Sequence, residues 1–315
     1  MNNNIILSVD GLSKSYNDFC AVDNISFTVN RGEVFGLLGP NGAGKTTTIK
    51  MLCGLLKCDS GSIEINGYSI KSDYNKVKTM IGLCPQDIVV WEHLTCMEQL
   101  KFMITAYGNS MRTAPNRAES LLKALGLWEK RNKLAKTLSG GMQRRLNIAL
   151  AIAHDPELII LDEPQAGLDP QSRILVRDFI RRLAKERTVI LTTHDMDEAD
   201  RLSDRVAIID HGKILLIDTP EKIKNSAGTS DILQVRVSEA VQEQAQKVLS
   251  RLPETITGRT YTDGFFLLEA NEILELIPEV SKIMQNFDLK VEDMTIRKRT
   301  LEDAFISMTG RGLRE

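Results

Sequence analysis

The sequence predicts an α/β fold with a parallel sheet and flanking helices, followed by a smaller α+β domain. Short apolar runs rich in β-forming residues alternate with segments of helical spacing, as such a sheet requires. One of these runs enters a glycine-rich loop that leads into a helical pattern. Near residue 225 small polar residues interrupt the pattern, and the arrangement of apolar and polar residues after them is different. At 315 residues the chain exceeds what one small core usually organises, so two packed units are expected.

The composition is that of an ordinary globular protein. Forty Lys and Arg face 42 Asp and Glu, which gives a formal charge of -2, and 42% of the residues are hydrophobic. This balance excludes disorder for most of the chain. It also provides no broad positive potential for a nucleic-acid backbone, so no nucleic-acid partner is expected.

The chain is not expected to cross a membrane or to be secreted. No apolar run approaches the roughly 20 residues that span a bilayer. The first seven residues lack the basic start and the long apolar core of a secretory signal. The five cysteines are odd in number and form no Cys-x-x-Cys pair, which favours reduced thiols and a cytoplasmic location.

Strands and helices of the first domain follow from apolar runs and helical spacing. Residues 34–38 are predicted to form the first strand, and residues 46–56 the helix after the glycine-rich loop. Further strands are expected at 158–161, 188–192 and 205–210, and further helices at 97–106, 117–125 and 140–153. Those helices fill a stretch with almost no strand signal, so they predict a helical subdomain inserted at about 87–157.

The second domain is expected over residues 229–315, after the small polar linker. Its predicted elements are a strand at 231–237, a helix at 239–252, a hairpin of strands at 255–261 and 265–269, a helix at 272–284, a strand at 289–297 and a last helix at 301–308. The order β-α-β-β-α-β is ferredoxin-like, with the final helix appended. No phosphate, metal or acid-base pattern occurs in it, which favours an accessory role.

The glycine-rich loop fits the phosphate-loop pattern G-x-x-x-x-G-K-[ST] and has a strand before it and a helix after it. Its residues are Gly39, Pro40, Asn41, Gly42, Ala43, Gly44, Lys45 and Thr46, followed by Thr47. The glycines let backbone N–H groups converge on phosphate oxygens at a helix start. Lys45 is expected to reach the β- and γ-phosphates, and the Thr46 hydroxyl to ligate Mg²⁺. A glycine turn with a merely solvated lysine would explain neither the preceding strand nor the following threonine.

Two adjacent carboxylates end the strand predicted at 158–161. An acid at the end of a buried strand is unfavourable unless it meets a cation. Asp162 is therefore predicted to help hold Mg²⁺, and Glu163 to orient and deprotonate an attacking water. By itself such a pair is usually a solvated strand end, but the phosphate loop upstream reverses that preference.

The segment Leu-Ser-Gly-Gly-Met-Gln at residues 138–143 resembles the signature sequence of the ABC (ATP-binding cassette) ATPases. The resemblance runs from Ile6 to about Lys224 in the order of the family's motifs: Tyr16, the phosphate loop, Gln86, the signature, Asp162-Glu163, Ala166-Gly167-Leu168-Asp169 and His194. It implies an ABC ATPase domain over residues 1–228, which is a P-loop NTPase fold with an inserted helical subdomain. ATP and Mg²⁺ are the implied cofactors.

The resemblance also implies roles for single residues. Tyr16 would stack on adenine, Gln86 would touch Mg²⁺ and the attacking water, and His194 would contact the γ-phosphate. Ser139, Gly140 and Gly141 offer a hydroxyl and N–H groups at a helix start, which is a second anion site. In the family this site closes on the ATP of another subunit, so that two ATP molecules lie between two head-to-tail subunits. Asp169 belongs to the loop that crosses that interface.

Two residues depart from the commonest family pattern. Met142 replaces a glutamine, and Gln165 replaces a hydroxyl residue. The Met form resembles ATPase subunits of the exporter branch that includes daunorubicin-type drug exporters, and residues 300–310 resemble the closing segment of the carboxy-terminal domain in that branch. Arg144 and Arg145 follow the signature, and pairing with acids of the helical insertion is one expectation for them.

The sequence therefore favours an ATP-hydrolysing subunit that energises a separate membrane permease. Export of drugs or other amphipathic compounds is favoured over import, and the subunit is expected on the inner face of the cell membrane through the permease. A second ATPase subunit is implied, and one complete set of half-sites permits a homodimer. The alternative is a soluble ABC ATPase acting on ribosomes or nucleic acid, although such proteins usually carry tandem cassettes or long coiled coils. A P-loop kinase would have no reason to keep Ser139 and His194.

Overall fold

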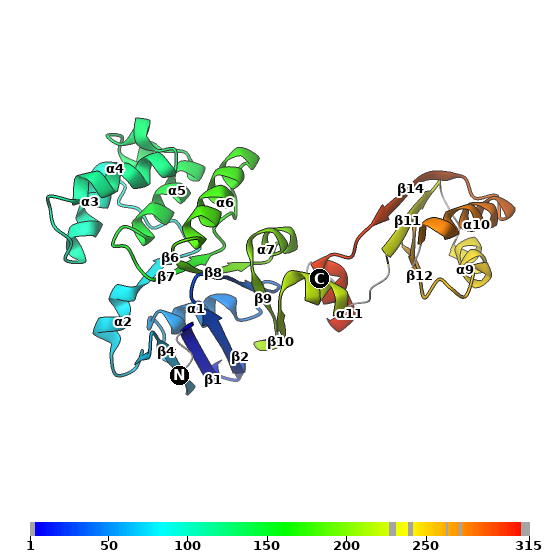
Figure 1. The fold of residues 1–315 in the computed structure, drawn as a ribbon, viewed down its shortest axis with the longest axis horizontal. Helices are drawn as coiled ribbons and strands as arrows, with labels where there is room; N and C mark the ends of the chain where they lie inside the picture. The colour runs from blue at the N-terminus through cyan, green and yellow to red at the C-terminus, as the bar shows by residue number, and fades with distance from the viewer. Residues whose placement is uncertain (1–3, 227–230, 239–241, 263, 271–272, 310–315) are drawn as a thin grey trace. The chain divides into compact units, whose positions relative to one another are not determined.

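The computed structural model of the chain describes residues 4–226, 231–238, 242–262, 264–270 and 273–309 (Figure 1). Contacts between Cα atoms divide it after Pro220 into two units, each with its own core. This division lies earlier in the chain than the expected boundary at residue 228, because the helix α8 (Pro220–Ser226) groups with the second unit.

A six-stranded sheet forms the centre of the first unit, in the order β10-β9-β3-β8-β7-β6. Its strands are β3 (Val34–Leu38), β6 (Ile81–Cys84), β7 (Leu158–Asp162), β8 (Thr188–Thr193), β9 (Arg205–Asp210) and β10 (Lys213–Asp218). All neighbours pair in parallel except β10, which is antiparallel to β9. The strands β3, β7, β8 and β9 confirm the prediction from the apolar runs. The short β6 was not expected, and its Gly82 is required because a Cβ there would lie 2.2 Å from the carbonyl oxygen of Ala151.

A second, antiparallel sheet in the order β2-β1-β4-β5 was not expected from the sequence. Its strands are β1 (Ile5–Tyr16), β2 (Phe19–Asn30), β4 (Ser60–Ile65) and β5 (Tyr68–Ser69). The pairing of β1 with β2 changes register at several points, including the step from Val9 to Leu12. Each shift interrupts the alternation of apolar and polar residues that identifies a strand in a sequence.

The central strands β3, β7 and β8 of the six-stranded sheet are buried along their whole length, as near-continuous apolar strands require. Ile160 and Ile190 join the core that the sheet shares with β1, β2 and β4. Ile159 and Leu191 point to the opposite face, into the core shared with the helices of the insertion. The helices of the first unit are α1 (Lys45–Leu52), α2 (Tyr74–Met80), α3 (Cys96–Ala106), α4 (Ala114–Ala124), α5 (Gly140–Ala151), α6 (Pro170–Ala184) and α7 (Met196–Leu202).

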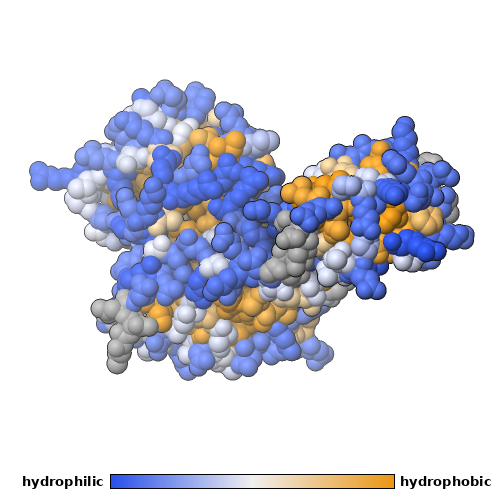
Figure 2. Space-filling view, turned by 45° about the vertical axis from the view of Figure 1, so that its right-hand side comes forward, coloured by the Kyte–Doolittle hydropathy of each residue, from blue (hydrophilic) through white to orange (hydrophobic). Residues whose placement is uncertain are grey.

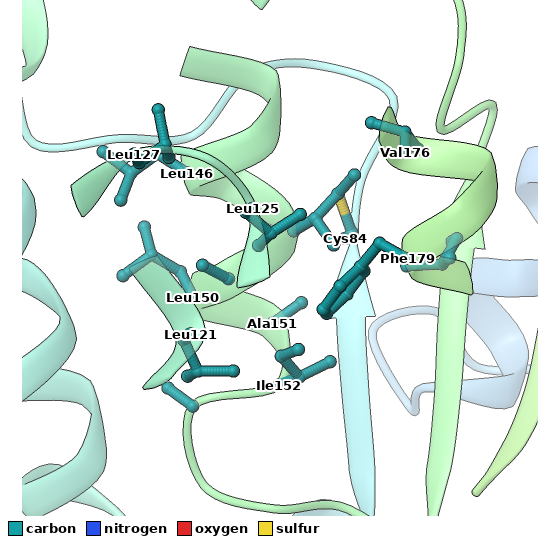
Figure 3. Packing of buried hydrophobic residues seen from close by; sticks show 14 of the residues in the cluster. Cys84, Leu121, Leu125, Leu127, Leu146, Leu150, Ala151, Ile152, Val176 and Phe179 are labelled. Atoms are coloured by element: carbon teal, nitrogen blue, oxygen red, sulfur yellow. The ribbon is translucent and has the colours of Figure 1, made fainter. Parts of the chain in front are cut away.

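The inserted helical subdomain is present, with α3, α4 and α5 in the stretch where helices were expected. Apolar residues of α4 and α5 pack on β6 and α6, and Figure 3 shows Phe179 of α6 reaching toward Ala151 and Ile152 at the end of α5. A capping box starts α3, because the Thr95 hydroxyl accepts a bond from the N–H of Glu98 at 3.2 Å. The packing of α4 and α5 on β6 and α6 ties the signature helix α5 to the central sheet.

The second unit has a four-stranded antiparallel sheet in the order β12-β13-β11-β14. Its further elements are β11 (Asp231–Val237), α9 (Gln242–Arg251), β12 (Gly258–Thr262), β13 (Phe265–Ala270), α10 (Ile273–Asn286), β14 (Val291–Arg297) and α11 (Leu301–Thr309). The two β-α-β halves interleave, with β11 and β13 in the centre, so the ferredoxin-like prediction is confirmed. Apolar residues also reach the surface of this unit on the face drawn in Figure 2. None of the helices in the described parts of the chain is long and apolar enough to cross a membrane.

Candidate active site

The candidate site lies at one edge of the six-stranded sheet, where β6, β7, β8 and β3 are neighbours. The register pairs Leu38 with Thr193, Asp162 with Thr192, and Cys84 with Leu161. Because these strands are parallel and in register, the segments that follow them leave the sheet at the same edge. The phosphate loop, Gln86, Glu163 and His194 follow these four strands directly or within two residues.

The phosphate loop connects β3 to α1, and two of its glycines are required by close contacts. A Cβ at Gly39 would lie 2.1 Å from the carbonyl oxygen of Ile209, and one at Gly44 would lie 2.4 Å from the carbonyl oxygen of Ala21. Gly44 also adopts a φ of 103°, which L side chains rarely adopt. The loop therefore packs tightly against the backbones of β9 and β2 at the start of α1, where N–H groups can receive an anion.

Lys45 is buried and folds back over the loop. Its Nζ donates to the carbonyl oxygens of Gly39 and Pro40 at 2.8 and 2.9 Å and lies 3.9 Å from the carboxylate of Glu163. Burial lowers the pKa of Lys45, and the nearby charges of Glu163 and Asp162 oppose that shift. An ammonium group held by two carbonyls at this point can exchange them for phosphate oxygens.

Thr46 and Asp162 meet as the sequence predicted for a magnesium site. The Thr46 hydroxyl donates to Oδ2 of Asp162 at 3.1 Å, and Asp162 is 3% exposed. The hydroxyl of Thr192 donates to the other carboxylate oxygen, Oδ1. Mg²⁺ prefers oxygen ligands and usually takes only one or two from the protein, with phosphates and waters completing its shell. A hydroxyl and a carboxylate beside the phosphate loop fit such an ion.

Glu163 is the centre of the predicted catalytic group. Gln86 donates from Nε2 to Oε2 of Glu163 at 3.2 Å, and Nδ1 of His194 lies 3.0 Å from Oε1. With Lys45, three side chains from separate segments thus surround one buried carboxylate. His194 is half exposed, so this group opens to solvent on the side of His194.

The backbone of Glu163 is strained. Its φ of 47° lies in the left-handed region, which costs a non-glycine residue on the order of 1–3 kcal/mol and persists only where the surroundings enforce it. Its N–H donates to the carbonyl oxygen of Thr192 at 3.2 Å and to its hydroxyl oxygen at 3.0 Å. This turn directs the carboxylate of Glu163 away from the strand and toward Gln86 and His194.

The signature residues form a second group with Asp169. Ser139 caps α5 and accepts from the N–H of Met142 at 3.3 Å, and Asp169 caps α6 and accepts from the N–H of Ser172 at 3.0 Å. A Cβ at Gly141 would lie 3.0 Å from the hydroxyl of Ser172, whereas one at Gly140 would meet no described residue within 4 Å. Two helix starts therefore lie side by side, and Gly140 has free space next to it.

Tyr16 ends β1 and pairs across the hairpin with Phe19, and both rings are exposed. The chain then runs on to Ala21, whose carbonyl oxygen would touch a Cβ at Gly44 of the phosphate loop. The hairpin thus connects two exposed aromatic rings to the rim of the loop. Of this pair, Phe19 was not expected from the sequence.

Arg144 was missed as a residue of the site. It is 2% exposed, and its guanidinium donates to the main-chain carbonyl oxygens of Gln86 and Glu163. Arg145 donates to the carbonyl oxygen of Leu125 at 2.8 Å. The expectation that these arginines pair with acids of the helical insertion is therefore wrong, because both side chains are long enough to reach unpaired backbone carbonyls instead. The only signal in the sequence was the position of Arg144 directly after the signature.

A pocket of about 380 Å³ lies beside the site, between the sheet and the helical subdomain. Its lining is mostly apolar and includes Pro85 and Val89, on either side of Gln86. The remaining lining residues are Cys53, Leu55, Tyr74, Lys78, Ile81, Leu83, Trp91, Met103, Tyr107, Asn147, Leu150, Ala151 and His154. Val89 is 62% exposed and Trp91 44%, so apolar side chains line an open surface here.

The chain is similar to known ATP-binding proteins over almost its whole length. A family model described as ABC transporter matches residues 22–166. The chain is 36% identical to the linearmycin resistance ATP-binding protein LnrL of Bacillus subtilis, over 98% of this chain and 100% of that protein. It is 38% identical to the daunorubicin/doxorubicin resistance ATP-binding protein DrrA of Streptomyces peucetius, over 96% and 92%, and 34% identical to the Nod factor export ATP-binding protein I of Ralstonia nicotianae, over 98% and 95%.

Solved structures give the same assignment for the fold. An ATP binding subunit of an ABC transporter matches with a TM-score of 0.65 at 32% identity, covering 70% of this chain and 92% of that chain. The protein cbiO1 of Clostridium perfringens, part of the ABC transporter complex cbiONQ, matches with a TM-score of 0.65 at 28% identity, covering 80% and 97%.

Proposed function

Because the chain belongs to the ATP-binding subunits of ABC transporters, we propose that it hydrolyses ATP at the edge of its parallel sheet to drive a separate membrane permease. It is an ATPase of the ABC type with a ferredoxin-like second unit. The observation that carries the proposal is the buried Glu163, which three side chains surround beside the pair Thr46 and Asp162. Relatives named for resistance to linearmycin and daunorubicin favour export of drugs or other amphipathic compounds.

The phosphate loop and α1 bind the triphosphate in this proposal. Backbone N–H groups of the loop after Pro40 and of the first turn of α1 donate to its oxygens, and Lys45 leaves the carbonyls of Gly39 and Pro40 to neutralise the β- and γ-phosphates. Tyr16 stacks on adenine from the adjoining hairpin. Thr46, Asp162 and Gln86 would hold Mg²⁺, which supplies positive charge to the leaving and transferred phosphates when bound.

Hydrolysis follows from the surroundings of Glu163. Its carboxylate accepts a proton from the attacking water, while the amide of Gln86 orients that water. The oxygen of the water then bonds to the γ-phosphorus, and the bond to the β-phosphate oxygen breaks. His194 contacts the γ-phosphate and donates to the negative charge that builds there.

A second copy of the subunit completes each site. The N–H groups at the start of α5, with the hydroxyl of Ser139, donate to the γ-phosphate held by the partner's phosphate loop. Gly140 and Gly141 allow that approach, and Asp169 lies at the same interface because its helix start adjoins α5. ATP binding thus closes a head-to-tail homodimer, and hydrolysis reopens it.

The pocket beside Gln86 is the proposed docking site for the permease. Its occupant is a short cytoplasmic segment of the permease with an apolar face, because exposed apolar residues such as Val89 and Trp91 line the pocket. Pro85 and Val89 flank Gln86, so an occupant of the pocket bears directly on the loop that holds this glutamine. This contact places the subunit on the inner face of the membrane.

Detergent-solubilised pull-down from the native membrane tests the proposal. A permease should co-purify with the wild-type chain, and Val89→Asp should lose it while the isolated subunit still hydrolyses ATP. Leu215→Asp is the matched control, because Leu215 is also exposed but lies on β10 at the opposite end of the sheet from β6. Recovery of ribosomes or nucleic acid in place of a permease would favour the alternative class of soluble ABC ATPase.

A further inference from the structure

We propose that Arg144 is a positioning residue for hydrolysis, which fixes the backbone at Gln86 and Glu163 in the arrangement that brings their side chains together. The proposal rests on the proposed function, in which Gln86 orients water and Glu163 accepts its proton. Arg144 lies on the signature helix α5, 58 residues after Gln86 and 19 residues before Glu163. Its side chain therefore links three segments that are distant in the sequence.

The guanidinium of Arg144 is fully engaged with main-chain oxygens. Nη1 donates to the carbonyls of Pro85 and Gln86, Nη2 to those of Asp162 and Glu163, and Nε to that of Pro164. The bonds to Gln86 and Glu163 measure 2.9 and 2.8 Å. These carbonyls belong to the last residue of β7 and to residues just beyond the ends of β6 and β7, where the ladder of the sheet stops.

Only an arginine can make this set of bonds. Its planar group presents five N–H donors in a fixed fork, whereas lysine presents three donors at one point. The charge is buried, which is unfavourable unless hydrogen bonds compensate for the lost water. Because the partners are backbone atoms, the interaction fixes the course of the chain and leaves the side chains of Gln86 and Glu163 free to meet each other at 3.2 Å.

The strained turn at Glu163 explains why the hydrogen bonds of Arg144 are needed. A φ of 47° persists only if the surroundings enforce it. Thr192 holds the N–H of Glu163, and Arg144 holds its carbonyl oxygen together with that of Asp162. Without Arg144 the carbonyl oxygen of Glu163 keeps the bond from the N–H of Ala166 at 3.2 Å but loses its charged donor. The turn is then held less firmly, and the carboxylate can move away from the attacking water.

The same face of α5 also holds the rest of the loop after Gln86. Asn147, one turn beyond Arg144, donates to the carbonyl oxygen of Asp87 at 3.2 Å and accepts from the N–H of Val89 at 3.4 Å. A shift of α5, whose first residues form the second phosphate site, would therefore move Gln86 and Glu163 with it. Arg144 thus makes the hydrolytic step, rather than ATP binding, respond to the signature helix.

A purely structural arginine offers the matched control. Arg117 also donates to backbone carbonyls, those of Ala153 and Ile152 at 2.6 and 2.8 Å, but none of its partners belongs to the site. Arg117→Lys and Arg144→Lys therefore remove the same kind of interaction at two places. If Arg144 is a positioning residue, kcat falls in Arg144→Lys and stays unchanged in Arg117→Lys.

The experiment compares these variants in the full chain, with kcat, KM, the affinity for MgATP and the melting temperature measured for each. Arg144→Lys should lose on the order of 10²-fold in kcat, because a misplacement of about 1 Å at the reacting groups has that effect. Its affinity for MgATP should stay within about threefold of wild type, which marks a loss confined to the transition state. Arg117→Lys should keep wild-type kcat. In Arg144→Ala, guanidinium well below denaturing concentrations should restore part of the activity, and sodium chloride at equal concentration should not.

Four results would overturn the proposal: wild-type kcat in a folded Arg144→Lys, equal losses of affinity and kcat, an equal loss in Arg117→Lys, or an Arg144→Lys variant that does not fold. Glu163→Gln, measured alongside, separates this proposal from the proposed function. If Glu163→Gln is inactive and Arg144→Lys is fully active, only the role of Arg144 is wrong. If Glu163→Gln hydrolyses ATP like wild type, the proposed base is wrong, and the role of Arg144 is wrong with it.

Discussion

The carboxylate of Glu163 is held by three side chains, and each of them has a different consequence for the reaction. Lys45 brings a positive charge to within 3.9 Å, Gln86 donates a hydrogen bond, and His194 contacts the other oxygen. A neutral amide in the same place keeps the size of the side chain and most of these contacts. It loses the negative charge and, with it, the ability to accept a proton, which makes this position suited to a test of binding against hydrolysis.

Glu163→Gln should bind ATP and fail to hydrolyse it. Removing one negative charge should also ease the approach of two subunits whose triphosphates repel each other. The variant should therefore form a dimer with ATP but not with ADP, and light scattering with ATP, with ADP and without nucleotide measures this directly. Glu186→Gln, at an exposed position, is the control and should behave as wild type. A Glu163→Gln variant that binds ATP and stays monomeric would contradict the proposed head-to-tail dimer with two ATP molecules between its subunits.

Glu198 gives the chain a pH-dependent stability. Its Oε2 accepts from the hydroxyl of Thr193 at 2.6 Å, and among the described residues its buried Oε1 has no partner. Burial raises the pKa of Glu198 to about 7, the Thr193 bond opposes this, and the charges of Asp195 and Glu163 add to it, with a small opposite effect from His194. A raised carboxyl pKa stabilises the fold at low pH, and that contribution is lost as the pH rises through about 7.

Glu198→Gln should therefore gain stability relative to wild type between pH 5 and pH 8. Glutamine stays neutral, so it avoids the burial of a charge that wild type suffers at higher pH. The difference should reach on the order of 2 kcal/mol, measured as the change with pH in the melting temperature of variant minus wild type. Glu186→Gln, at an exposed position, is the control measured alongside. A constant difference for Glu198→Gln would mean that Glu198 titrates normally.

The start of α5 lies next to α6 of the same chain and, in the proposed dimer, next to the ATP of the partner subunit. Gly141 faces Ser172 and Asp169 at the start of α6, while Gly140 faces open space. Gly141 is thus needed for the packing of α5 on α6, whereas Gly140 is needed for the proposed interface. Ser139 completes the helix start by capping it.

Gly140→Ala should raise the melting temperature and yet weaken the ATP-dependent dimer. Alanine favours a helix over glycine by up to about 1 kcal/mol, and no residue in the described parts of the chain opposes the added methyl group. Gly141→Ala should melt at a lower temperature than Gly140→Ala, because its methyl group would lie 3.0 Å from the Ser172 hydroxyl. Each glycine change, combined separately with Glu163→Gln, should reduce the amount of dimer that light scattering detects at limiting ATP. An undiminished dimer in Gly140→Ala would place the partner's phosphate elsewhere.

The two units of the chain each bury an apolar core built from their own residues. The residues proposed for ATP binding and hydrolysis all lie in the first unit, up to Pro220. The second unit has a ferredoxin-like sheet, and we propose for it a regulatory or dimer-stabilising role. Nucleotide binding by one subunit should therefore not need it.

Truncation after Gly228 should leave ATP binding intact. The affinity for MgATP, measured by titration calorimetry, should remain within about threefold of the full chain, since no proposed contact is lost. The ATP-dependent dimer of Glu163→Gln should weaken in the truncated chain if the second unit stabilises it. The full chain carrying Glu163→Gln is the control. A truncated chain that stays folded but no longer binds ATP would place the second unit in the site.

Strands were predicted well where burial on both faces leaves a continuous apolar run, as at β3, β7, β8 and β9. The same reasoning missed β1 and β2, because bulges break their alternation, and it missed β6, which has only four residues and a glycine. In the second unit the order of strands and helices along the chain was foreseen because regular alternation survives along β11 and β13. Local pattern thus identifies an element only when its pairing is regular.

By itself the sequence determined the phosphate loop, the two acids at the end of β7 and the signature, because each of these sites needs several residue types at consecutive positions. Only the tertiary structure decided that Gln86, His194 and Lys45 meet at Glu163, since this depends on the register of four parallel strands. It alone also revealed Arg144, whose partners are main-chain carbonyl oxygens. Every residue carries such an oxygen, so no pattern of side chains can mark where an arginine will bind them.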